Sequence, residues 1–491
     1  MEGLRRNCMN DNGGIVSGVL WKFAERILAQ IVSLVVSVVL ARILLPEDYG
    51  IVAMVTVFIT VANVFVTSGI PTALIQKKDA DNKDFSAVFY FNLFFSLVIY
   101  SLIYLAAPYV ARFYLMPTLS TVLRVMGLRI IISAINSVQH SYVSRHMMFR
   151  KYFWSTLFGT VVSGFIGIVM AYNRFGVWAL VAQYMVNTTI DTTVLFFTVE
   201  WRPSLYFSWT RIKELVVYGW KVLFEGVSNT IFQQIQSLII GKVYTSGDLG
   251  FYTKAQQFPN LLVTNISVSV SSVLLPTFSN LQDKEYKVQK MLRKSVRLTC
   301  FLIVPMLVGL AAVADAFVTV VLTEKWLACV PFMQVYCVVN LAYSMLIPRH
   351  QALLGIGRSD IFMYEHIFSR IIQLIILILT FRVSVFAITI STLVGAIIML
   401  FIVAFTSKRF NQYSYRLQIE DVTPSISGSL IMFIIVYPLS FWRISPMLKL
   451  IAQMTIGCLV YIMFSIKFNR EGIDFSKGLI QKLMKALKKK T

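Results

Sequence analysis

The charged side chains that interrupt the long apolar runs of this sequence are the first candidates for chemistry. A charge near the centre of a bilayer costs at least about 2.5 kcal/mol on insertion scales, so it normally faces a water-filled cavity or a charged partner. Basic residues there can bind an anionic substrate, and acidic residues can bind a proton or a cation. The basic candidates are Lys22, Arg26, Arg124, Arg129, Lys221 and Arg370, and the acidic candidates are Glu25, Asp191, Glu225 and, at the margin, Glu365.

Some of these charges also have a plain structural interpretation. Lys22 and Lys221 lie near the ends of their runs, where a lysine can extend to the membrane surface. Asp191 lies between threonines in VNTTIDTTVLFF. It is either a proton or cation site of a coupled transporter or the ion-pair partner of an inner arginine. Arg129 and Arg370 lie deep in their runs, and we expect both to face a cavity.

Uncharged polar side chains extend two of these patterns into stripes. The first stripe is Lys22, Arg26, Gln30, Ser33 and Ser37, and the second is Glu225, Asn229, Gln233 and Gln236. Steps of three and four place each set on one helix face. Lipid offers such a face no hydrogen bonds, so it must turn inward. The stripes either join helices or line a cavity, and their recurrence in both halves of the chain favours the cavity.

The composition indicates which elements carry these residues. Of the 491 residues, 57% are hydrophobic and only 14% are charged, with a mean hydropathy of +0.72. A soluble domain has about 25% charged residues, so the sequence predicts an all-α polytopic membrane protein. The net charge is +22. Because the charges lie between apolar runs, we assign them to lipid headgroups and membrane orientation and expect no nucleic-acid partner.

Apolar runs long enough to cross a membrane, about 20 residues each, recur along the whole chain. They lie near 16–41, 50–70, 86–107, 120–142, 154–172, 176–198, 216–241, 255–275, 297–317, 330–353, 361–380, 384–406, 425–442 and 447–467. The sequence therefore predicts about fourteen transmembrane helices.

The chain also contains an internal repeat, which identifies two related halves. WKFAERILAQIVSLVVSVVLARILLPEDYG from Trp21 resembles WKVLFEGVSNTIFQQIQSLIIGKVYTSGDLG from Trp220. Glu25, Asp48 and Gly50 recur 200 positions later, and Pro71-Thr72 recurs 205 positions later. Six runs fall in each half. Because six is even, the repeats are parallel, and we expect them to form two lobes around a central cavity.

Lysines and arginines in the connections predict the orientation. One alternating set of segments, which includes both termini, carries thirty of them and the other set carries nine. The positive-inside rule then places both termini in the cytoplasm. The expected parts are an N-terminal lobe (1–198), a cytoplasmic linker (199–215), a C-terminal lobe (216–406), two added helices (407–467) and a basic tail (468–491). The tail pattern fits a helix lying on an anionic leaflet or a solvated, frayed end.

No motif of an enzyme or a metal site is apparent. The sequence lacks a Walker A motif, GxGxxG and HExxH, and its four histidines and five cysteines show no metal-ligand spacing. The outer loops are too short to fold as catalytic domains. We therefore expect no catalytic residues, no metal and no cofactor, and a secondary transporter or flippase for an anionic substrate.

Two segments carry a family resemblance. ARILLPEDYGIVAM, followed by SGIPTALIQKKD, resembles the polysaccharide transporter branch of the MOP superfamily. Within it the chain is most similar to the Wzx-type flippases of the WzxC/TuaB-like subgroup, as is IIGKVYTSGDLGFYTKAQQFPNLLVTNISVSVSSVLLPTFSNLQ in the second half. The resemblance implies a bacterial inner-membrane protein that moves an undecaprenyl-diphosphate-linked oligosaccharide outward by alternating access, for capsule, exopolysaccharide or O-antigen synthesis. Proton or sodium coupling occurs in some relatives.

The resemblance also suggests roles for the candidate residues. Related flippases line their cavity with arginines, and Arg26 is the matching position. We hypothesise that Arg26, Lys22 and Lys221 capture the diphosphate, that Arg124, Arg129 and Arg370 hold it, and that Asp191, Glu225 or Glu25 binds the coupling ion. Gln30, Ser33, Asn229, Gln233 and Gln236 would contact the glycan. The repeat encloses the site in one chain, so a monomer that works beside the polysaccharide polymerase machinery is expected.

Other functions remain open at this point. An ion-coupled multidrug or organic-cation exporter of the same superfamily predicts a cavity dominated by carboxylates, whereas the deep charges here are mostly basic. A membrane polysaccharide polymerase or ligase predicts a large outer loop with catalytic residues. A membrane scaffold would gain little from the cost of intramembrane charges.

Overall fold

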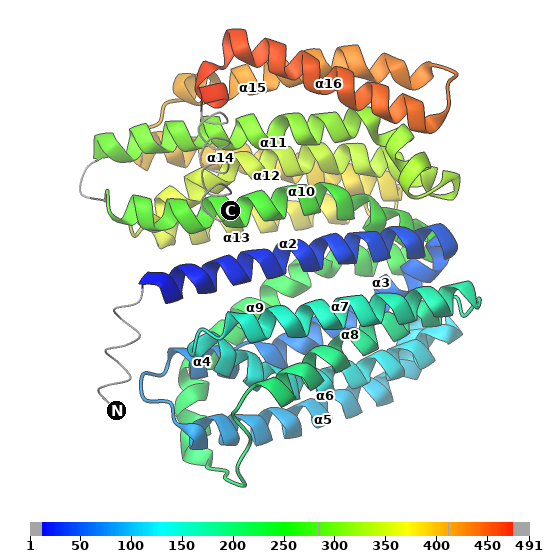
Figure 1. Cartoon of the computed structure of the whole chain (residues 1–491), viewed down its shortest axis with the longest axis vertical. Coiled ribbons are helices and arrows are strands. Elements are labelled where there is room, and N and C mark those ends of the chain that lie inside the picture. The colour runs from blue at the N-terminus through cyan, green and yellow to red at the C-terminus, as the bar shows by residue number, and fades with distance from the viewer. Residues whose placement is uncertain (1–11, 283–284, 411, 475–491) are drawn as a thin grey trace. The chain divides into compact units, whose positions relative to one another are not determined.

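The computed structural model describes residues 12–282, 285–410 and 412–474. Side chains are described from Leu28 onward within those ranges, except for Tyr218 and Glu285. All regular elements in the described ranges are helices. Contacts divide the chain into two compact units, Met1–Gly250 and Phe251–Thr491. Figure 1 shows the helices of each unit lying alongside one another.

The first unit contains α2 (Asn12–Ile43), α3 (Pro46–Thr67), α4 (Ile70–Gln76), α5 (Asn82–Phe113), α6 (Pro117–Arg145), α7 (Phe149–Tyr172), α8 (Val177–Thr198), α9 (Trp209–Val243) and the start of α10 (Ser246–Ser279). The second unit contains the rest of α10, α11 (Glu285–Val321), η1 (Glu324–Cys329), α12 (Val330–Gly355), α13 (Ser359–Thr380), α14 (Val385–Phe410), α15 (Tyr415–Val436), η2 (Tyr437–Phe441) and α16 (Pro446–Phe468).

The all-α polytopic fold predicted from the sequence is confirmed. Each of the fourteen apolar runs is helical over most of its length, although the run at 50–70 is divided between α3 and α4 and the run at 425–442 between α15 and η2. In the described ranges, eleven helices are long and apolar enough to cross a membrane; the total of fourteen spans stays a prediction. The runs at 16–41, 176–198 and 216–241 correspond to α2, α8 and α9, which are outside the eleven. For α2 only the part Leu28–Ile43 enters this assessment, whereas α8 carries Asp191 and α9 carries the second polar stripe.

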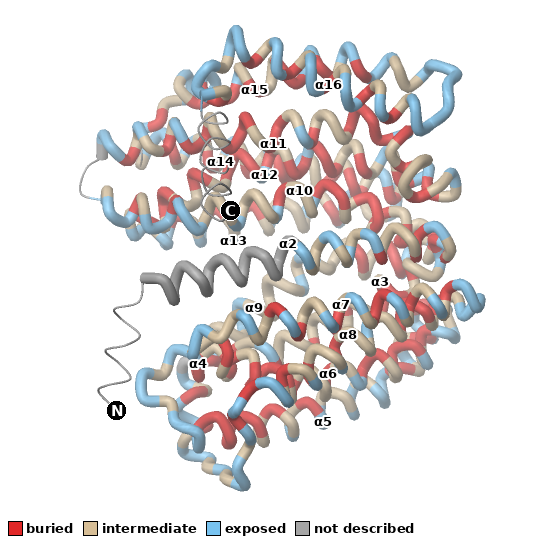
Figure 2. The backbone as a smooth tube through the Cα atoms, viewed as in Figure 1, coloured by how far each residue is buried: buried red, intermediate tan, exposed pale blue. Residues whose placement is uncertain are grey.

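Burial follows the pattern expected for helices embedded in lipid. Figure 2 shows buried positions on the faces that neighbouring helices turn toward one another and exposed positions on their outer faces. Several large apolar side chains are exposed: Phe401 is 72% exposed and Met463 is 70% exposed. In water this surface would be costly, whereas lipid tails solvate it without penalty.

One apolar run that the sequence presents as continuous is broken. The run at 50–70 divides into α3 and α4 around Ser68 and Gly69. Gly69 has φ +71°, which only glycine adopts readily. Pro71 lacks an N–H group and so cannot continue the hydrogen-bond ladder of α3. The break therefore leaves backbone carbonyls near Thr67 without their usual helical donors.

The two corners related by the sequence repeat have similar local structure. At the start of α3 the Leu45 N–H donates to Asp48 Oδ2 at 3.1 Å, and at the start of α10 the Thr245 N–H donates to Asp248 Oδ2 at 3.2 Å. Gly50 and Gly250 each face the backbone of the other corner. A Cβ on Gly50 would lie 1.7 Å from the Ser246 oxygen, and one on Gly250 would lie 2.0 Å from the Pro46 oxygen.

The contact units do not divide the chain at the predicted lobe boundary. Helix α9, the first helix of the second repeat, packs against α3, α4 and α5 of the first unit. Gly219 of α9 crosses the α3–α4 break, since a Cβ on it would lie 2.8 Å from the Gly69 carbonyl carbon. The predicted boundaries rest on the repeat and stay predictions. The predicted tail helix within 475–491 lies outside the described residues.

Candidate functional site

A polar wall on α6 faces the α3–α4 break in the first unit. A cavity of about 300 Å³ separates the two, lined by Thr67, Pro71, Thr72 and Ile75 from the broken segment and by Ser133, Asn136, Ser137, His140, Ser141 and Ser144 from α6. Steps of three and four bring these α6 residues to one face. Because broken helices commonly line substrate and ion sites in transporters, this cavity is the leading candidate site.

Polar side chains support the broken backbone beside the cavity. Asn92 of α5 donates from Nδ2 to the Val66 carbonyl at 3.2 Å and to Ser137 Oγ at 3.2 Å. Ser141 donates from Oγ to the Pro71 carbonyl at 3.3 Å. Backbone carbonyls at membrane depth must find donors within the protein. These bonds supply donors and hold the wall against the break.

Asp191 of α8 reaches across to this wall. Asn136 donates from Nδ2 to Asp191 Oδ2 at 2.6 Å, and His140 Nε2 lies 3.2 Å from the same oxygen. The Asp191 side chain is 16% exposed. Within the described side chains its ion partner is His140, and no arginine pairs with it. A carboxylate held by an amide and an imidazole can exchange a proton or bind a small cation.

Arg129 of α6 also contacts α8. Its Nε donates to Thr188 Oγ1 at 2.7 Å, and its guanidinium carbon lies 5.4 Å from the centre of the Tyr184 ring. Thr188 and Tyr184 are on α8, within two turns of Asp191. The structure thus brings two predicted residues, Arg129 and Asp191, to the α6–α8 contact.

Arg124, also on α6, has different surroundings. Its Nε donates to the Tyr104 carbonyl at 3.3 Å, and its guanidinium carbon lies 4.3 Å from the centre of the Tyr104 ring. Tyr104 belongs to α5, so Arg124 contributes to the α5–α6 contact. The structure does not bring Arg124 to the polar wall.

The other predicted site residues whose side chains are described do not line this cavity. On α9, Lys221, Glu225 and Gln233 are exposed, and Asn229 and Gln236 are half-buried, with Gln233 Nε2 donating to Asn229 Oδ1 at 3.4 Å. On α2, Gln30 is half-buried and Ser33 is exposed. Arg370 is half-buried on α13 of the second unit. Lys22, Glu25 and Arg26 belong to α2, but their side chains lie outside the described residues.

The partners of Asp191 were not predicted from the sequence. Asn136 and His140 stand one turn apart in the run SAINSVQHSY, and that spacing was available as a signal. A second buried carboxylate was also underrated. Glu365 of α13 is 3% exposed, accepts a hydrogen bond from the Thr406 hydroxyl at Oε1, and has His350 Nε2 3.6 Å from Oε2.

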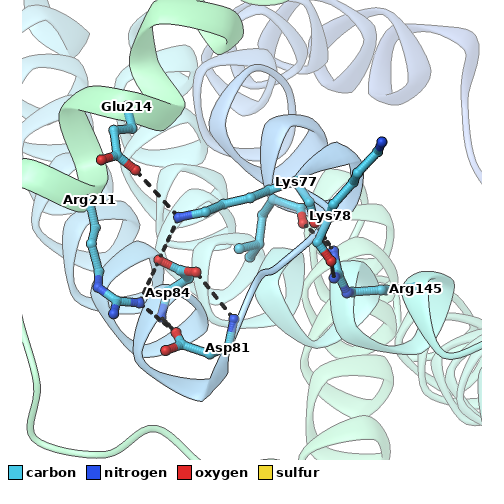
Figure 3. A network of polar contacts seen from close by, with 8 residues as sticks. Lys77, Lys78, Asp81, Asp84, Arg145, Arg211 and Glu214 are labelled. Atoms are coloured by element: carbon cyan, nitrogen blue, oxygen red, sulfur yellow. Dashed lines mark hydrogen bonds and ion pairs between the residues drawn. The ribbon is translucent and has the colours of Figure 1, made fainter. Parts of the chain in front are cut away.

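An ion-pair network joins α4, α5 and α9 at the predicted cytoplasmic end of the first unit (Figure 3). The buried carboxylate of Asp84 lies 3.1 Å from Lys77 Nζ and 2.9 Å from Arg211 Nη1, and Arg211 also lies 2.6 Å from Asp81. Arg211 donates hydrogen bonds to the carboxylates of Asp81 and Asp84, and these bonds raise the pKa of Arg211. Partial burial by itself raises the pKa of Asp81, but hydrogen bonds from the Asp84 N–H and from Arg211 outweigh it and lower that pKa.

Arg145, at the end of α6, also holds the C-terminal end of α4 in place (Figure 3). Its guanidinium donates to the carbonyls of Leu74, Ile75 and Lys77, and to that of Lys78 at 2.6 Å. The last carbonyls of α4 lack helical partners, and a cation stabilises a helix C-terminus. Arg145 thereby holds α4, one wall of the cavity, against α6.

Comparison with known proteins identifies the family. Residues 39–331, more than half of the chain, match the family described as polysaccharide biosynthesis protein. The chain belongs to this family. The teichuronic acid biosynthesis protein TuaB of Bacillus subtilis is 24% identical over 71% of this chain and 73% of its own length. The lipopolysaccharide biosynthesis protein WzxC of Escherichia coli is 23% identical over 70% and 71%.

A further relative and two solved structures agree with this assignment. The succinoglycan biosynthesis transport protein ExoT of Rhizobium meliloti is 26% identical over 59% of this chain and 58% of its own length. The lipid II flippase MurJ has a similar fold, with a TM-score of 0.76 over 93% of this chain and all of MurJ at 18% identity. An inward-facing multidrug MATE transporter of the MOP superfamily has a TM-score of 0.59 over 78% and 96% at 14% identity. The resemblance to a polysaccharide transporter family is confirmed, the fold is shared with these two structures, and the protein is a multi-pass integral membrane protein.

Proposed function

We propose that this protein moves an undecaprenyl-diphosphate-linked oligosaccharide from the cytoplasmic to the outer leaflet of the bacterial inner membrane by alternating access. The product would supply capsule, exopolysaccharide or O-antigen synthesis, beside the polymerase that consumes it. The family and the names of the relatives support a role in polysaccharide export. The observation that carries the proposal is the hydroxyl-rich wall of α6 at the α3–α4 break, inside an apolar helix bundle.

The chemistry of that wall suits a glycan. Serine and threonine hydroxyls both donate and accept hydrogen bonds, so they can replace the water that a sugar loses when it enters the membrane. Among the described side chains Arg129 donates to Thr188 through Nε, and its terminal nitrogens can donate to phosphate oxygens. The prenyl chain needs no polar site, because it can remain in the lipid.

The Asp191 cluster supplies the proposed coupling site. Protonation of Asp191, or binding of Na⁺ to it, changes the hydrogen bonds to Asn136 and His140 on α6. Arg129 joins the same two helices through Thr188. Ion binding and phosphate binding would therefore act on one helix contact, which gives them a physical route of coupling.

The test is to delete the gene and to quantify undecaprenyl-linked glycans by mass spectrometry, with and without the gene restored. The proposal expects one defined lipid-linked oligosaccharide to accumulate on the cytoplasmic side and to disappear on restoration. If nothing accumulates in a strain without a second flippase, the proposal is wrong. Efflux of cationic dyes, measured in the same strains, would then test the exporter of the same superfamily.

A further inference from the structure

A second cavity, in the second unit, is lined by none of the residues of the site described above. It has a volume of about 630 Å³ and lies between the N-terminal part of α11 and the segment that follows α16. Its lining residues are Tyr286, Gln289, Lys290, Arg293, Lys294, Arg297, Leu298, Glu471 and Asp474. Four basic side chains against two carboxylates make its lining net positive.

The position of the cavity across the membrane follows from the length of α11 and from where its charged residues lie. The helix has 37 residues, which span about 55 Å, whereas the hydrocarbon core of a bilayer is about 30 Å thick. Basic residues end at Arg297, and no charged residue occurs in 298–314. Because Arg297 and Leu298 both line the cavity, it lies where the hydrocarbon gives way to lipid headgroups.

Two of the basic side chains, Arg293 and Arg297, are held in place by ion pairs. Arg293 makes a bidentate pair with Asp421 of α15, with both N–O distances 2.9 Å, and Arg297 Nε lies 2.7 Å from the same carboxylate. The Asp421 side chain is fully buried. Arg297 also lies 2.9 Å from Glu471. The carboxylates of Asp421 and Glu471 offset most of the positive charge of both arginines. The pairs with Asp421 also hold α11 against α15.

The two lysines of the cavity can interact with an external anionic partner. Lys290 and Lys294 stand one turn apart on α11 and are exposed. Within the described residues neither lies within ion-pair distance of a carboxylate, and Asp474 is the single lining carboxylate without an ion pair. The opposite face of α11 is anchored in the core by Val288, Leu292 and Val296. The lysines are thus presented toward the cavity by a fixed helix.

We propose that this cavity binds the phosphate headgroup of a membrane lipid, with Lys290 and Lys294 as its ligands. Basic pockets between transmembrane helices on the cytoplasmic side are suited to anionic headgroups. The sequence 475–491 contains six lysines and no acidic side chain, so it supplies no anionic side chain as a partner for these lysines. The proposal is independent of which substrate the protein moves across the membrane.

The experiment titrates the purified full-length protein in detergent with phosphatidylglycerol and, separately, with phosphatidylcholine, and measures bound lipid by native mass spectrometry. The wild type is expected to prefer phosphatidylglycerol. Replacing both lysines (Lys290→Gln with Lys294→Gln) should weaken phosphatidylglycerol binding about 20- to 30-fold and leave phosphatidylcholine binding unchanged.

The matched control is Lys287→Gln. Lys287 is exposed on the same helix but does not line the cavity. If the control weakens binding as much as the double variant, or if the double variant binds phosphatidylglycerol like the wild type, the proposal is overturned. A monodisperse size-exclusion profile of each variant shows that it remains folded, as expected for exposed positions.

Two competitors then identify the source of the phosphate. Undecaprenyl diphosphate that displaces phosphatidylglycerol at equal mole fraction would assign the cavity to the prenyl lipid, and failure to displace it would assign the cavity to the phospholipid. Inorganic pyrophosphate serves as the soluble probe. If it competes as strongly as either lipid, the ligand is not lipid-borne and the proposal is wrong.

Discussion

Arg124 and Arg129 are five residues apart on α6, yet their guanidinium groups have different neighbours. Arg124 lies against Tyr104 of α5, and Arg129 lies against Thr188 and Tyr184 of α8, close to the Asp191 cluster. Both are apparent as intramembrane charges in the sequence, which already favoured Arg129 as the cavity-facing one. The structure supports this ranking, because Arg129 contacts α8 near Asp191 whereas Arg124 contacts α5.

This ranking predicts different effects of the two alanine variants. Arg129→Ala should lower polymer export about tenfold or more, because a charge-assisted hydrogen bond to a phosphate contributes about 1.5–3 kcal/mol. Arg124→Ala should have the smaller effect. Complementation of the deletion strain at matched protein level measures both. Equal export by the two variants would contradict the assignment of Arg129 to the substrate.

Asp191 permits a sharper test of ion coupling. The Asp191→Asn variant retains the size of the side chain, but its amide carries no charge and binds no proton in the pH range of the assay. We expect transport to fall about tenfold, within the usual range of coupling energies, and to lose its dependence on pH or Na⁺. The assay is lipid-linked oligosaccharide flipping in proteoliposomes between pH 6 and 8.

Asp315→Asn is the matched control for Asp191→Asn. Asp315 is an exposed residue of the apolar helix α11, so its loss should leave the pH profile as it is in the wild type. A pH profile that survives in Asp191→Asn and changes in Asp315→Asn would move the coupling site away from α8.

At the scale of the elements, the corners at the starts of α3 and α10 depend on glycine. A Cβ at Gly50 or Gly250 would overlap a backbone oxygen of the facing corner, and backbone cannot rotate away as a flexible side chain can. We expect Gly50→Ala and Gly250→Ala each to destabilise the protein by about 2–3 kcal/mol or more. Thermal unfolding in detergent measures this loss.

Gly309→Ala provides the comparison within an apolar helix. A Cβ there would meet only Met432 Cε at 3.5 Å, an ordinary contact, and alanine is the better helix former. This variant should unfold at or slightly above the temperature of the wild type. Glycine variants at the two corners that behave like Gly309→Ala would mean that these corners can separate without cost.

The network at the end of α4 and α5 gives a second prediction for the elements. Asp84→Asn removes the buried negative charge that lies between Lys77 and Arg211, so Lys77 keeps only its pair with Glu214 and Arg211 only its pair with Asp81 among the described residues. We expect a loss of about 2–4 kcal/mol, seen as a lower unfolding temperature. Asp79→Asn, an exposed position in the same connection, should have almost no effect, and an equal loss there would show that the network does not support α4.

At the scale of the whole molecule, the charge pattern predicts membrane orientation. The connection that holds Lys78 should face the cytoplasm and the one that holds Arg443 should face outward. In a cysteine-free background, an impermeant maleimide applied to intact cells should label Arg443→Cys but not Lys78→Cys. Both side chains are exposed, so the reagent can reach either one. Labelling of Lys78→Cys but not of Arg443→Cys would show that the topology is the inverse of the predicted one. The proposed capture of substrate from the cytoplasmic side would then be wrong.

The sequence alone determined the class of the protein. Apolar runs with few charges must be helices in lipid, because every backbone group has to be paired internally, and all fourteen runs are helical over most of their length. The repeat at 200 positions anticipated the matching corners at Asp48 and Asp248. The family follows from the same local patterns, such as LLPEDYG, which are readable without any long-range contact.

The tertiary structure decided which polar residues meet. Asp191 is 51 residues from His140, and Arg129 is 59 residues from Thr188; helical periodicity relates positions along one helix and carries no information on which face packs against which neighbour. The break at Gly69 was also not apparent, because a single glycine in an apolar run is compatible with an unbroken helix. Only the packing of α3, α4, α6 and α8 reveals the polar cavity beside the break.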